Sequence, residues 1–282
     1  MQESSPWPTT EKRLARMRDK LSLEASDGIS PAAPHPPQPE IPAWLWWSYQ
    51  LYKWLIVIPV MLFSTFFFCT IIILFCFAGL PEFSSKVFGT LWARLNAFVT
   101  LMNISVYGKE KLRPGQSYVL VANHLSLLDI YVLYGFSGLD LKWVIKKELR
   151  KIPVLGLACE LMGHIYVDRS NTESALASIE TARHQIQNGM CVIFFPEGTR
   201  SRTQELRPFK KGAFGMARDL GIPVVPVSIH NTNRILPSDG LDWRPGAVQL
   251  RFHDPVLVDQ DADLDQLAVD TRSTIVDALN AD

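Results

Sequence analysis

The chain has few cysteines and no excess of either charge. Its 282 residues include four cysteines, and neither a CxxC pair nor a Cys/His spacing typical of zinc sites is present. We therefore expect no disulfide framework and no metal, and a reducing, cytoplasmic setting for the folded part. The 28 Lys+Arg and 28 Asp+Glu give a net charge of zero, which argues against a dedicated nucleic-acid-binding protein.

Other absences narrow the class of protein. No internal repeat is visible, and no secretory signal peptide is expected, because a long polar, proline-rich stretch precedes the first apolar run. The sequence has no Gly-x-Ser-x-Gly turn, which presents the nucleophile in many serine hydrolases. A serine hydrolase or thioesterase would have to use Ser126 outside such a turn, and it stays a remote alternative.

Charge is unevenly distributed along the chain. Residues 81–253 hold 21 Lys+Arg against 14 Asp+Glu, whereas Asp254–Asp282 holds eight Asp and one Arg. A basic surplus of this kind suits an anionic ligand or anionic lipid head groups. An ordinary solvated surface is the alternative.

The first 102 residues are predicted to form a tail and a membrane anchor. We predict a disordered tail over residues 1–40, because Ser30–Pro39 alone has five prolines. Residues 41–102 are predicted to hold the anchor and interfacial helices. Trp54–Gly79 has no charged residue in 26 positions, and as a helix it would measure about 39 Å, enough to cross a hydrocarbon core of about 30 Å. Pro59 either kinks this helix or divides it into a hairpin that dips into one leaflet, and a buried core helix is the remaining alternative.

Residues on both sides of the apolar run indicate its orientation. Aromatic side chains, which favour the membrane interface, cluster at its start: Trp44, Trp46, Trp47, Tyr49, Tyr52 and Trp54. Basic side chains follow its end: Lys86, Arg94, Lys109, Lys111 and Arg113. By the positive-inside tendency, we expect the folded domain on the cytoplasmic face of the inner cell membrane. Val87–Met102 has helical apolar spacing, and it either lies on the membrane or packs on the core.

Residues 103–282 alternate strand-like and helix-like segments. The predicted strands are Ser117–Ala122, Leu141–Ile145, His164–Val167, Cys191–Phe195, Val224–Ile229 and Val248–Phe252. The predicted helices are Leu127–Tyr134, Val154–Met162, Thr172–Asn188, Ala213–Leu220 and Asp263–Leu279. This alternation predicts an α/β fold with a mixed, largely parallel sheet flanked by helices.

A histidine and an aspartate separated by four residues follow the apolar run Tyr118–Ala122, in Asn123–Asp129 (NHLSLLD). On an ideal helix the two would be rotated by about 140°, so they meet only if His124 precedes the first turn and Asp129 lies inside it. Ser126 as N-cap, with Asp129 at the third helical position, makes this geometry feasible. An aspartate bonded to one ring nitrogen leaves the other nitrogen free as a base. The alternative is a capped helix beside a core histidine.

A charged turn, Phe195–Ser201 (FPEGTRS), follows another apolar run. The turn amides around Gly198 and the planar fork of donors on Arg200 suit a phosphate. A second anionic patch, or an exposed cationic face, is predicted from Lys146, Lys147, Arg150, Lys151 and Arg169. Pro226 either shapes a pocket or marks an edge strand, and we favour the edge strand.

Further signals accompany the two motifs: Lys146-Lys-Glu-Leu149, Pro153-x-x-Gly156, Gly163, Asp168-Arg169 and Val225-Pro-Val227. In that order and at those intervals, roughly residues 85–255 resemble the glycerolipid acyltransferases typified by bacterial 1-acylglycerol-3-phosphate acyltransferase. The histidine and aspartate match the HX4D motif of that family. The resemblance implies that His124 is the catalytic base and Asp129 its orienting partner. It also implies a glycerol phosphate site with the residues Glu197, Gly198, Thr199 and Arg200, to which we add Lys146.

The function implied is that of a membrane-bound O-acyltransferase. It would move a fatty acyl group from acyl-CoA or acyl-ACP to the sn-2 hydroxyl of 1-acyl-sn-glycerol-3-phosphate, giving phosphatidic acid. No cofactor is expected beyond this co-substrate, and the expected partners are a lysophospholipid, the membrane and, where it is the donor, acyl carrier protein. Alternatives within the fold differ in the acceptor, which would be glycerol-3-phosphate, another lysophospholipid or lyso-ornithine lipid. A non-catalytic lipid-binding or anchoring protein would require the His/Asp pair to be incidental.

Overall fold

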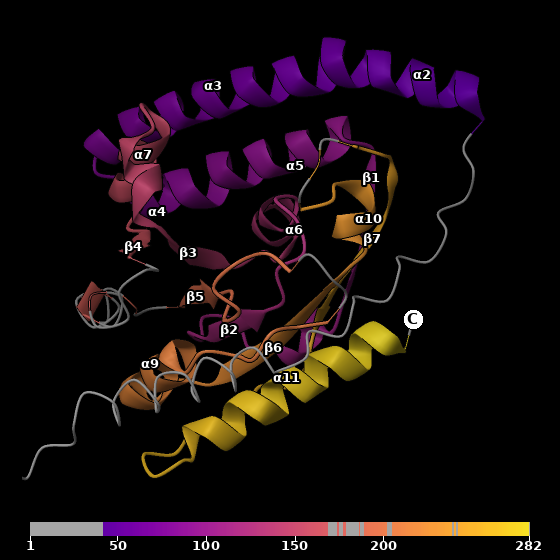
Figure 1. The fold of residues 1–282 in the computed structure, drawn as a ribbon. Coiled ribbons are helices and arrows are strands. Elements are labelled where there is room, and N and C mark those ends of the chain that lie inside the picture. The colour runs from indigo at the N-terminus through magenta and orange to yellow at the C-terminus, as the bar shows by residue number, and fades with distance from the viewer. Residues whose placement is uncertain are drawn as a thin grey trace, which may run out of the picture. The chain divides into compact units, whose positions relative to one another are not determined.

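The computed structural model describes residues 42–168, 174, 177, 178, 186, 189–201, 205–238, 240 and 242–281. The tail predicted over residues 1–40 and most of the helix predicted over Thr172–Asn188 lie outside these residues. Residues Pro39–Asp282 form one unit, which contains both the apolar N-terminal helix and the sheet (Figure 1).

Seven strands form a single sheet in the order β1-β7-β6-β2-β5-β3-β4. Their bounds are β1 Met102–Tyr107, β2 Val119–Ala122, β3 Asp140–Lys146, β4 Ile165–Val167, β5 Met190–Phe194, β6 Val224–His230 and β7 Gly246–Phe252. All neighbouring strands run parallel except β6 and β7, which are antiparallel. The prediction of a mixed, largely parallel sheet is confirmed.

Helices cover both faces of the sheet, so the domain has three layers (Figure 1). The α-helices after the anchor are α4 Pro81–Ser84, α5 Thr90–Val99, α6 Asp129–Phe136, α7 Leu155–Leu161, α9 Gly212–Leu220, α10 Thr232–Ile235 and α11 Leu264–Asn280. Short 3-10 turns occupy Lys109–Lys111 and Lys147–Lys151. One buried apolar cluster joins α5 and α6 to one face of the sheet, and a second joins α9 and α11 to the other. The sheet strands are apolar on both faces because both faces are buried.

The apolar N-terminal segment is one long helix. It comprises α2 (Ala43–Tyr52), a π-helical turn (Lys53–Val57) and α3 (Ile58–Phe77). The stretch Trp44–Phe77, 34 residues with a mean hydropathy of 2.6, is long and apolar enough to cross a membrane. Of the two alternatives at Pro59, the division into a hairpin is excluded, because the helix continues through the proline. The π-helical turn lies just before Pro59 and accommodates its missing N–H without breaking the helix.

Of the two alternatives for the segment after the apolar helix, packing on the core is confirmed. In α5 one face, which includes Ala93 and Ala97, is buried against α6 and the core. The opposite face leaves Leu91 and Phe98 exposed, the latter by 76%. The helix ends at Val99, earlier than predicted, because β1 follows at once.

Pro226 does not mark an edge strand, as the sequence suggested. Its strand, β6, lies between β7 and β2 in the interior of the sheet. The Pro226 carbonyl accepts a hydrogen bond from His253 N–H, so the proline nitrogen also faces β7. The ladder with β7 ends at the pair Val227–Phe252. The lack of an N–H donor at Pro226 is therefore tolerated, because this residue lies just past the last pair of the β6–β7 ladder.

The strand directions bring several loops to one edge of the sheet. Strands β2, β3, β5 and β6 are parallel, so their carboxyl ends lie at the same edge. The His124 segment follows β2, and the charged turn at Glu197 follows the adjacent strand β5. In open α/β sheets this edge is where ligand sites collect.

Candidate active site

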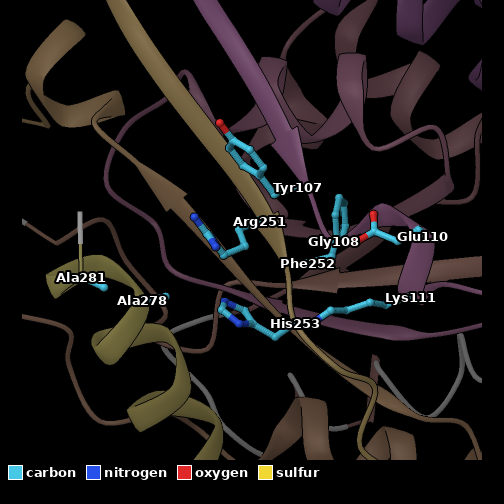
Figure 2. A pocket seen from close by; sticks show the side chains of 9 residues that line it. All are labelled: Tyr107, Gly108, Glu110, Lys111, Arg251, Phe252, His253, Ala278 and Ala281. Carbon is cyan, nitrogen blue, oxygen red and sulfur yellow. The ribbon is translucent and has the colours of Figure 1, made fainter.

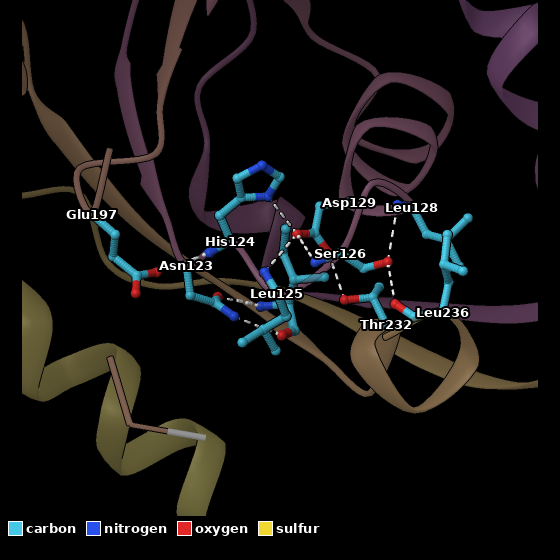
Figure 3. Close-up of polar contacts among 10 residues, drawn as sticks. Asn123, His124, Leu125, Ser126, Leu128, Asp129, Glu197, Thr232 and Leu236 are labelled. Carbon is cyan, nitrogen blue, oxygen red and sulfur yellow. Dashed lines mark hydrogen bonds and ion pairs between the residues drawn. The ribbon is translucent and has the colours of Figure 1, made fainter. Parts of the chain in front are cut away.

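The sheet edge holds His124 and Asp129 in direct contact. His124 lies in the loop after β2, and Asp129 is the first residue of α6. The His124 Nδ1 atom lies 2.8 Å from Asp129 Oδ2, and both residues are buried. No described residue hydrogen-bonds to Nε2, on the other side of the ring (Figure 3). This arrangement fixes the ring and leaves one nitrogen available to take a proton.

Asp129 accepts hydrogen bonds at both carboxylate oxygens. Besides His124, its Oδ2 accepts from the backbone N–H groups of Leu125 (2.8 Å) and Ser126 (2.9 Å). Its Oδ1 accepts from the Thr232 hydroxyl at 2.5 Å. A fully buried carboxylate is costly unless such donors surround it. These four contacts therefore hold the Asp129 carboxylate in one orientation.

Ser126 anchors the loop. The helix α6 begins at Asp129, two residues later than predicted. The N-cap is Leu128, without a side-chain cap, so the prediction of Ser126 as N-cap and Asp129 as third helical residue is wrong. The Ser126 hydroxyl accepts from Leu128 N–H, and Asp129 accepts from Ser126 N–H. The same hydroxyl donates to the Leu236 carbonyl at 2.8 Å. Buried and used in both directions, this hydroxyl is poorly suited to act as the nucleophile of a serine hydrolase.

Glu197 joins the charged turn to the histidine loop. Its Oε1 accepts from His124 N–H and its Oε2 from Arg207 N–H, each at 3.1 Å. Burial raises the pKa of Glu197, and the same two backbone donors act in the opposite direction. Both carboxylate oxygens are thus engaged by the protein's own main chain. Glu197 therefore supports the predicted glycerol phosphate site by holding the turn against the histidine loop.

The rest of the turn also approaches the histidine loop. Gly198 has a φ of +75°, which favours glycine, and its N–H donates to the Phe195 carbonyl. The Ser201 N–H donates to the His124 carbonyl at 2.8 Å. Thr199 is exposed and Arg200 half-buried, next to Ser201. The turn and the predicted base therefore lie side by side, because the strands that precede them, β5 and β2, are neighbours in the sheet.

Lys146 lies at the same edge but farther along the sheet. It ends β3, on the other side of β5 from His124, and its Nζ is 3.7 Å from Glu148. Among the described residues, Lys146 contacts neither His124 nor the charged turn. Within the predicted cationic patch, Lys147 pairs with Asp168 and Arg150 with Glu160, while Arg169 lies outside the described residues.

Three contributors to the site were not predicted. Phe195 stacks on the His124 ring, with centroids 3.9 Å apart and planes inclined by 11°. The Asn123 side chain bonds both the N–H and the carbonyl of Ile229 on β6, at 2.8 and 2.9 Å. Thr232 contacts Asp129 from the start of α10 (Figure 3). Asn123 and Phe195 directly adjoin the two motifs, whereas nothing in the sequence signals Thr232.

A cavity lies at the opposite edge of the sheet from His124. It measures about 390 Å³ and is lined by Tyr107, Gly108, Glu110, Lys111, Arg251, Phe252, His253, Ala278 and Ala281 (Figure 2). It adjoins the carboxyl ends of β1 and β7, which run opposite to β2. Its Lys111 pairs with Asp254 at 2.9 Å, and the Arg251 guanidinium lies over the Tyr107 ring. Because these two cationic side chains already have partners, this cavity is a weaker candidate for the active site than the sheet edge at His124.

Known proteins match the region of this chain that contains the His124 loop and the charged turn. The family model described as Acyltransferase matches residues 103–230. A 1-acyl-sn-glycerol-3-phosphate acyltransferase of Chlamydomonas reinhardtii is 30% identical over 98% of this chain and 82% of its own length. The chloroplastic 1-acyl-sn-glycerol-3-phosphate acyltransferase BAT2 of Brassica napus is 35% identical over 67% of this chain and 54% of its own length.

A solved structure shares the fold. The crystal structure of the 1-acyl-sn-glycerophosphate acyltransferase PlsC from Thermotoga maritima matches with a TM-score of 0.63 and 27% identity, over 79% of this chain and 94% of that one. The chain spans about half the length of the Brassica relative but most of the algal and Thermotoga proteins. The chain therefore belongs to the acyltransferase family that includes the 1-acyl-sn-glycerol-3-phosphate acyltransferases.

Proposed function

We propose that this protein transfers a fatty acyl group from acyl-CoA or acyl-ACP to the sn-2 hydroxyl of 1-acyl-sn-glycerol-3-phosphate. The product would be phosphatidic acid, a precursor in phospholipid biosynthesis. The observation that carries the proposal is the buried His124–Asp129 pair at 2.8 Å, with the second ring nitrogen unengaged by any described residue. The names of the relatives support the choice of acceptor.

The proposed reaction is a direct transfer. His124 Nε2 takes the proton from the acceptor hydroxyl as its oxygen attacks the thioester carbonyl. The tetrahedral intermediate then collapses, the C–S bond breaks, and the imidazolium returns the proton to the leaving thiolate. Asp129 keeps Nδ1 as the donor side of the ring and stabilises the imidazolium that forms. Atoms and charge balance without a cofactor, and the acyl thioester is the only co-substrate.

The charged turn is proposed to hold the phosphate of the acceptor. Arg200 carries a planar set of donors suited to phosphate oxygens, and it is one residue from Ser201, whose N–H contacts the His124 loop. Backbone at Gly198 and Thr199 adjoins it, and Glu197 keeps the turn against that loop. Lys146, at the same edge, is a more distant candidate for the head group or for a phosphate of the donor.

The protein is proposed to work on a membrane surface. The helix Trp44–Phe77 belongs to the same unit as the sheet, and most of its surface is exposed and apolar. We propose that it anchors the chain in the inner cell membrane, with the α/β domain on the cytoplasmic face, where basic residues follow the apolar run. An anchored enzyme meets a lysophospholipid without extracting it from the bilayer.

A panel of acceptors tests the proposal. The purified chain in lipid vesicles would receive acyl-CoA or acyl-ACP, each in turn with lysophosphatidic acid, glycerol-3-phosphate, another lysophospholipid or lyso-ornithine lipid. Product mass spectrometry should detect phosphatidic acid as the main product. Faster acylation of a different acceptor would replace the proposed substrate, and no acylation of any acceptor would contradict the proposed activity.

A further inference from the structure

The second oxygen of Asp129 has a single partner from a distant part of the chain. Oδ2 is shared by the His124 ring and two backbone N–H groups of the same loop. Oδ1 accepts only from the Thr232 hydroxyl, at 2.5 Å, among the described residues. Both Asp129 and Thr232 are fully buried, so water does not replace this donor.

The local fold places Thr232 at this position. Strand β6 ends at His230, and Asn231 takes a left-handed conformation with a φ of +67°, which turns the chain back toward α6. Before the turn, Asn123 holds the main chain of Ile229 through two hydrogen bonds. After it, the Leu236 carbonyl accepts from Ser126. The short helix α10 is therefore tied to the histidine loop on both sides of Thr232 (Figure 3).

The Thr232 hydroxyl restrains the orientation of the Asp129 carboxylate. A carboxylate rotates about its χ2 bond with a broad preference. Three contacts restrain that rotation at Oδ2, and the donor at Oδ1 adds a restraint on the other oxygen, which sets the direction in which Oδ2 meets the imidazole. Without it, Oδ1 would be a buried acceptor with no partner, which favours a change of rotamer.

We propose that Thr232 is a positioning residue for acyl transfer, acting on His124 through Asp129. The inference rests on the proposed function, because it assumes that His124 is the base. It predicts an effect on the chemical step and not on substrate binding, since Thr232 is buried behind Asp129. A threonine that only stabilises α10 would change stability and leave the turnover of the folded enzyme unaltered.

Two substitutions at the same position separate these roles. Thr232→Val keeps the shape and removes the hydroxyl, whereas Thr232→Ser keeps the hydroxyl and removes a methyl group. We expect kcat of Thr232→Val to fall about 10- to 100-fold with both KM values within twofold of the wild type, and Thr232→Ser to retain most of the activity. Thr271→Val is the matched control, because Thr271 is a buried threonine on α11 whose hydroxyl has no partner among the described residues.

The kinetics would be measured on the full-length chain in vesicles with lysophosphatidic acid and acyl-CoA, beside thermal unfolding of each variant. A kcat of Thr232→Val within twofold of the wild type overturns the inference. So does an equal loss in the serine and valine variants, or a rise in KM in place of a fall in kcat. If the valine variant does not fold, Thr232→Ala takes its place in the same comparison.

A double-mutant comparison tests the route through Asp129. In an Asp129→Asn background, Thr232→Val should change kcat by no more than twofold, because the carboxylate that it orients is already lost. The full single-mutant effect in that background would overturn the inference. Substantial activity in His124→Ala would instead refute the proposed base itself, so the failure of the proposed function is recognised separately.

Discussion

Asp129 and Glu197 are two buried carboxylates whose oxygens are all taken by donors of the protein itself. Asp129 faces the histidine ring, and Glu197 faces the main chain of the same histidine. Both sets of bonds are made within the protein itself, so the fold alone orients the imidazole. At the residue scale, these two buried carboxylates orient the histidine.

The contact between His124 and Asp129 was predictable from the sequence, and that of Thr232 was not. A separation of four residues between histidine and aspartate, at the end of an apolar run, restricts the geometry to a loop followed by a first helical turn. Thr232 is 103 residues from Asp129, and an isolated threonine after a strand carries no signal of its own. For the same reason the role of Glu197 toward His124 N–H required the fold, since it depends on the adjacency of β2 and β5.

Glu197→Ala should lower both stability and turnover. It removes the acceptor of the buried His124 N–H and of the Arg207 N–H, so we expect a loss of about 1–3 kcal/mol in the free energy of unfolding. The kcat should fall because the His124 main chain is released, while KM for the lysophospholipid changes little. Thermal unfolding and steady-state kinetics would measure this, with Glu110→Ala as an exposed control. An increased KM with unchanged stability would favour direct contact with substrate instead.

At the scale of elements, polar contacts join the anchor helix to the domain. Asn96 on α5 and Ser64 on α3 are buried and hydrogen-bonded at 3.1 Å, and the Trp92 indole donates to Thr65 at 3.0 Å. Since the facing surfaces are otherwise apolar, these contacts fix the register of α3 against α5 more than they add affinity. The domain is thereby oriented relative to the anchor.

Asn96→Ala should loosen this pair of helices. It removes the bond to Ser64 and a second one to the Trp92 carbonyl, and we expect a loss of about 1–2 kcal/mol in stability in detergent. Asn103→Ala, on the exposed side of β1, is the control. Limited proteolysis between α3 and α5 should be faster in Asn96→Ala alone. Equal proteolysis rates in both variants and the wild type would show that the contact does not hold the helices together.

Sequence patterns predicted six of the seven strands, including the edge strand β4, and missed the other edge strand, β1. Strands β2, β5 and β6 are continuous apolar runs, which is how strands buried on both faces read. The edge strand β1 was missed, because helical apolar spacing extended to Met102 and concealed the alternation of Met102, Ile104 and Val106. Pro226 was assigned to an edge strand because the sequence does not reveal that the ladder with β7 stops beside it.

For the whole molecule, two histidines with lowered pKa values predict acid sensitivity. Burial is the main cause that lowers the pKa of His164 to about 3, and the nearby charge of Lys142 adds to it. Burial is also the main cause that lowers the pKa of His253 to about 4, and the charges of Lys111 and Arg251 add to it. Below the ordinary value of about 6.5 the unfolded chain binds these protons and the folded chain does not, so stability is complete above 6.5 and falls as the pH drops toward 4.

His253→Gln should reduce this dependence, because glutamine does not titrate and can keep the contact with Ser228. Thermal unfolding from pH 7.5 to pH 4.5 should show a smaller fall in Tm for the variant than for the wild type. Parallel curves would mean that His253 is protonated equally well in the folded and unfolded chains.

The molecule as a whole combines an apolar helix, a three-layer domain and one edge at which a histidine loop and a charged turn meet. Each part alone occurs in many proteins. Their combination in one unit suits the proposed reaction between a lipid and a soluble or carrier-bound thioester, and the central claim of that proposal is proton removal by His124.

The most direct test of that claim is the initial rate of phosphatidic acid formation by His124→Ala beside the wild type, at equal amounts of vesicle-bound full-length protein. We predict a fall of about 10²- to 10⁴-fold, the usual contribution of a general base, with vesicle binding unchanged. A variant that keeps more than about a tenth of the wild-type rate would contradict the assignment of His124 as the base.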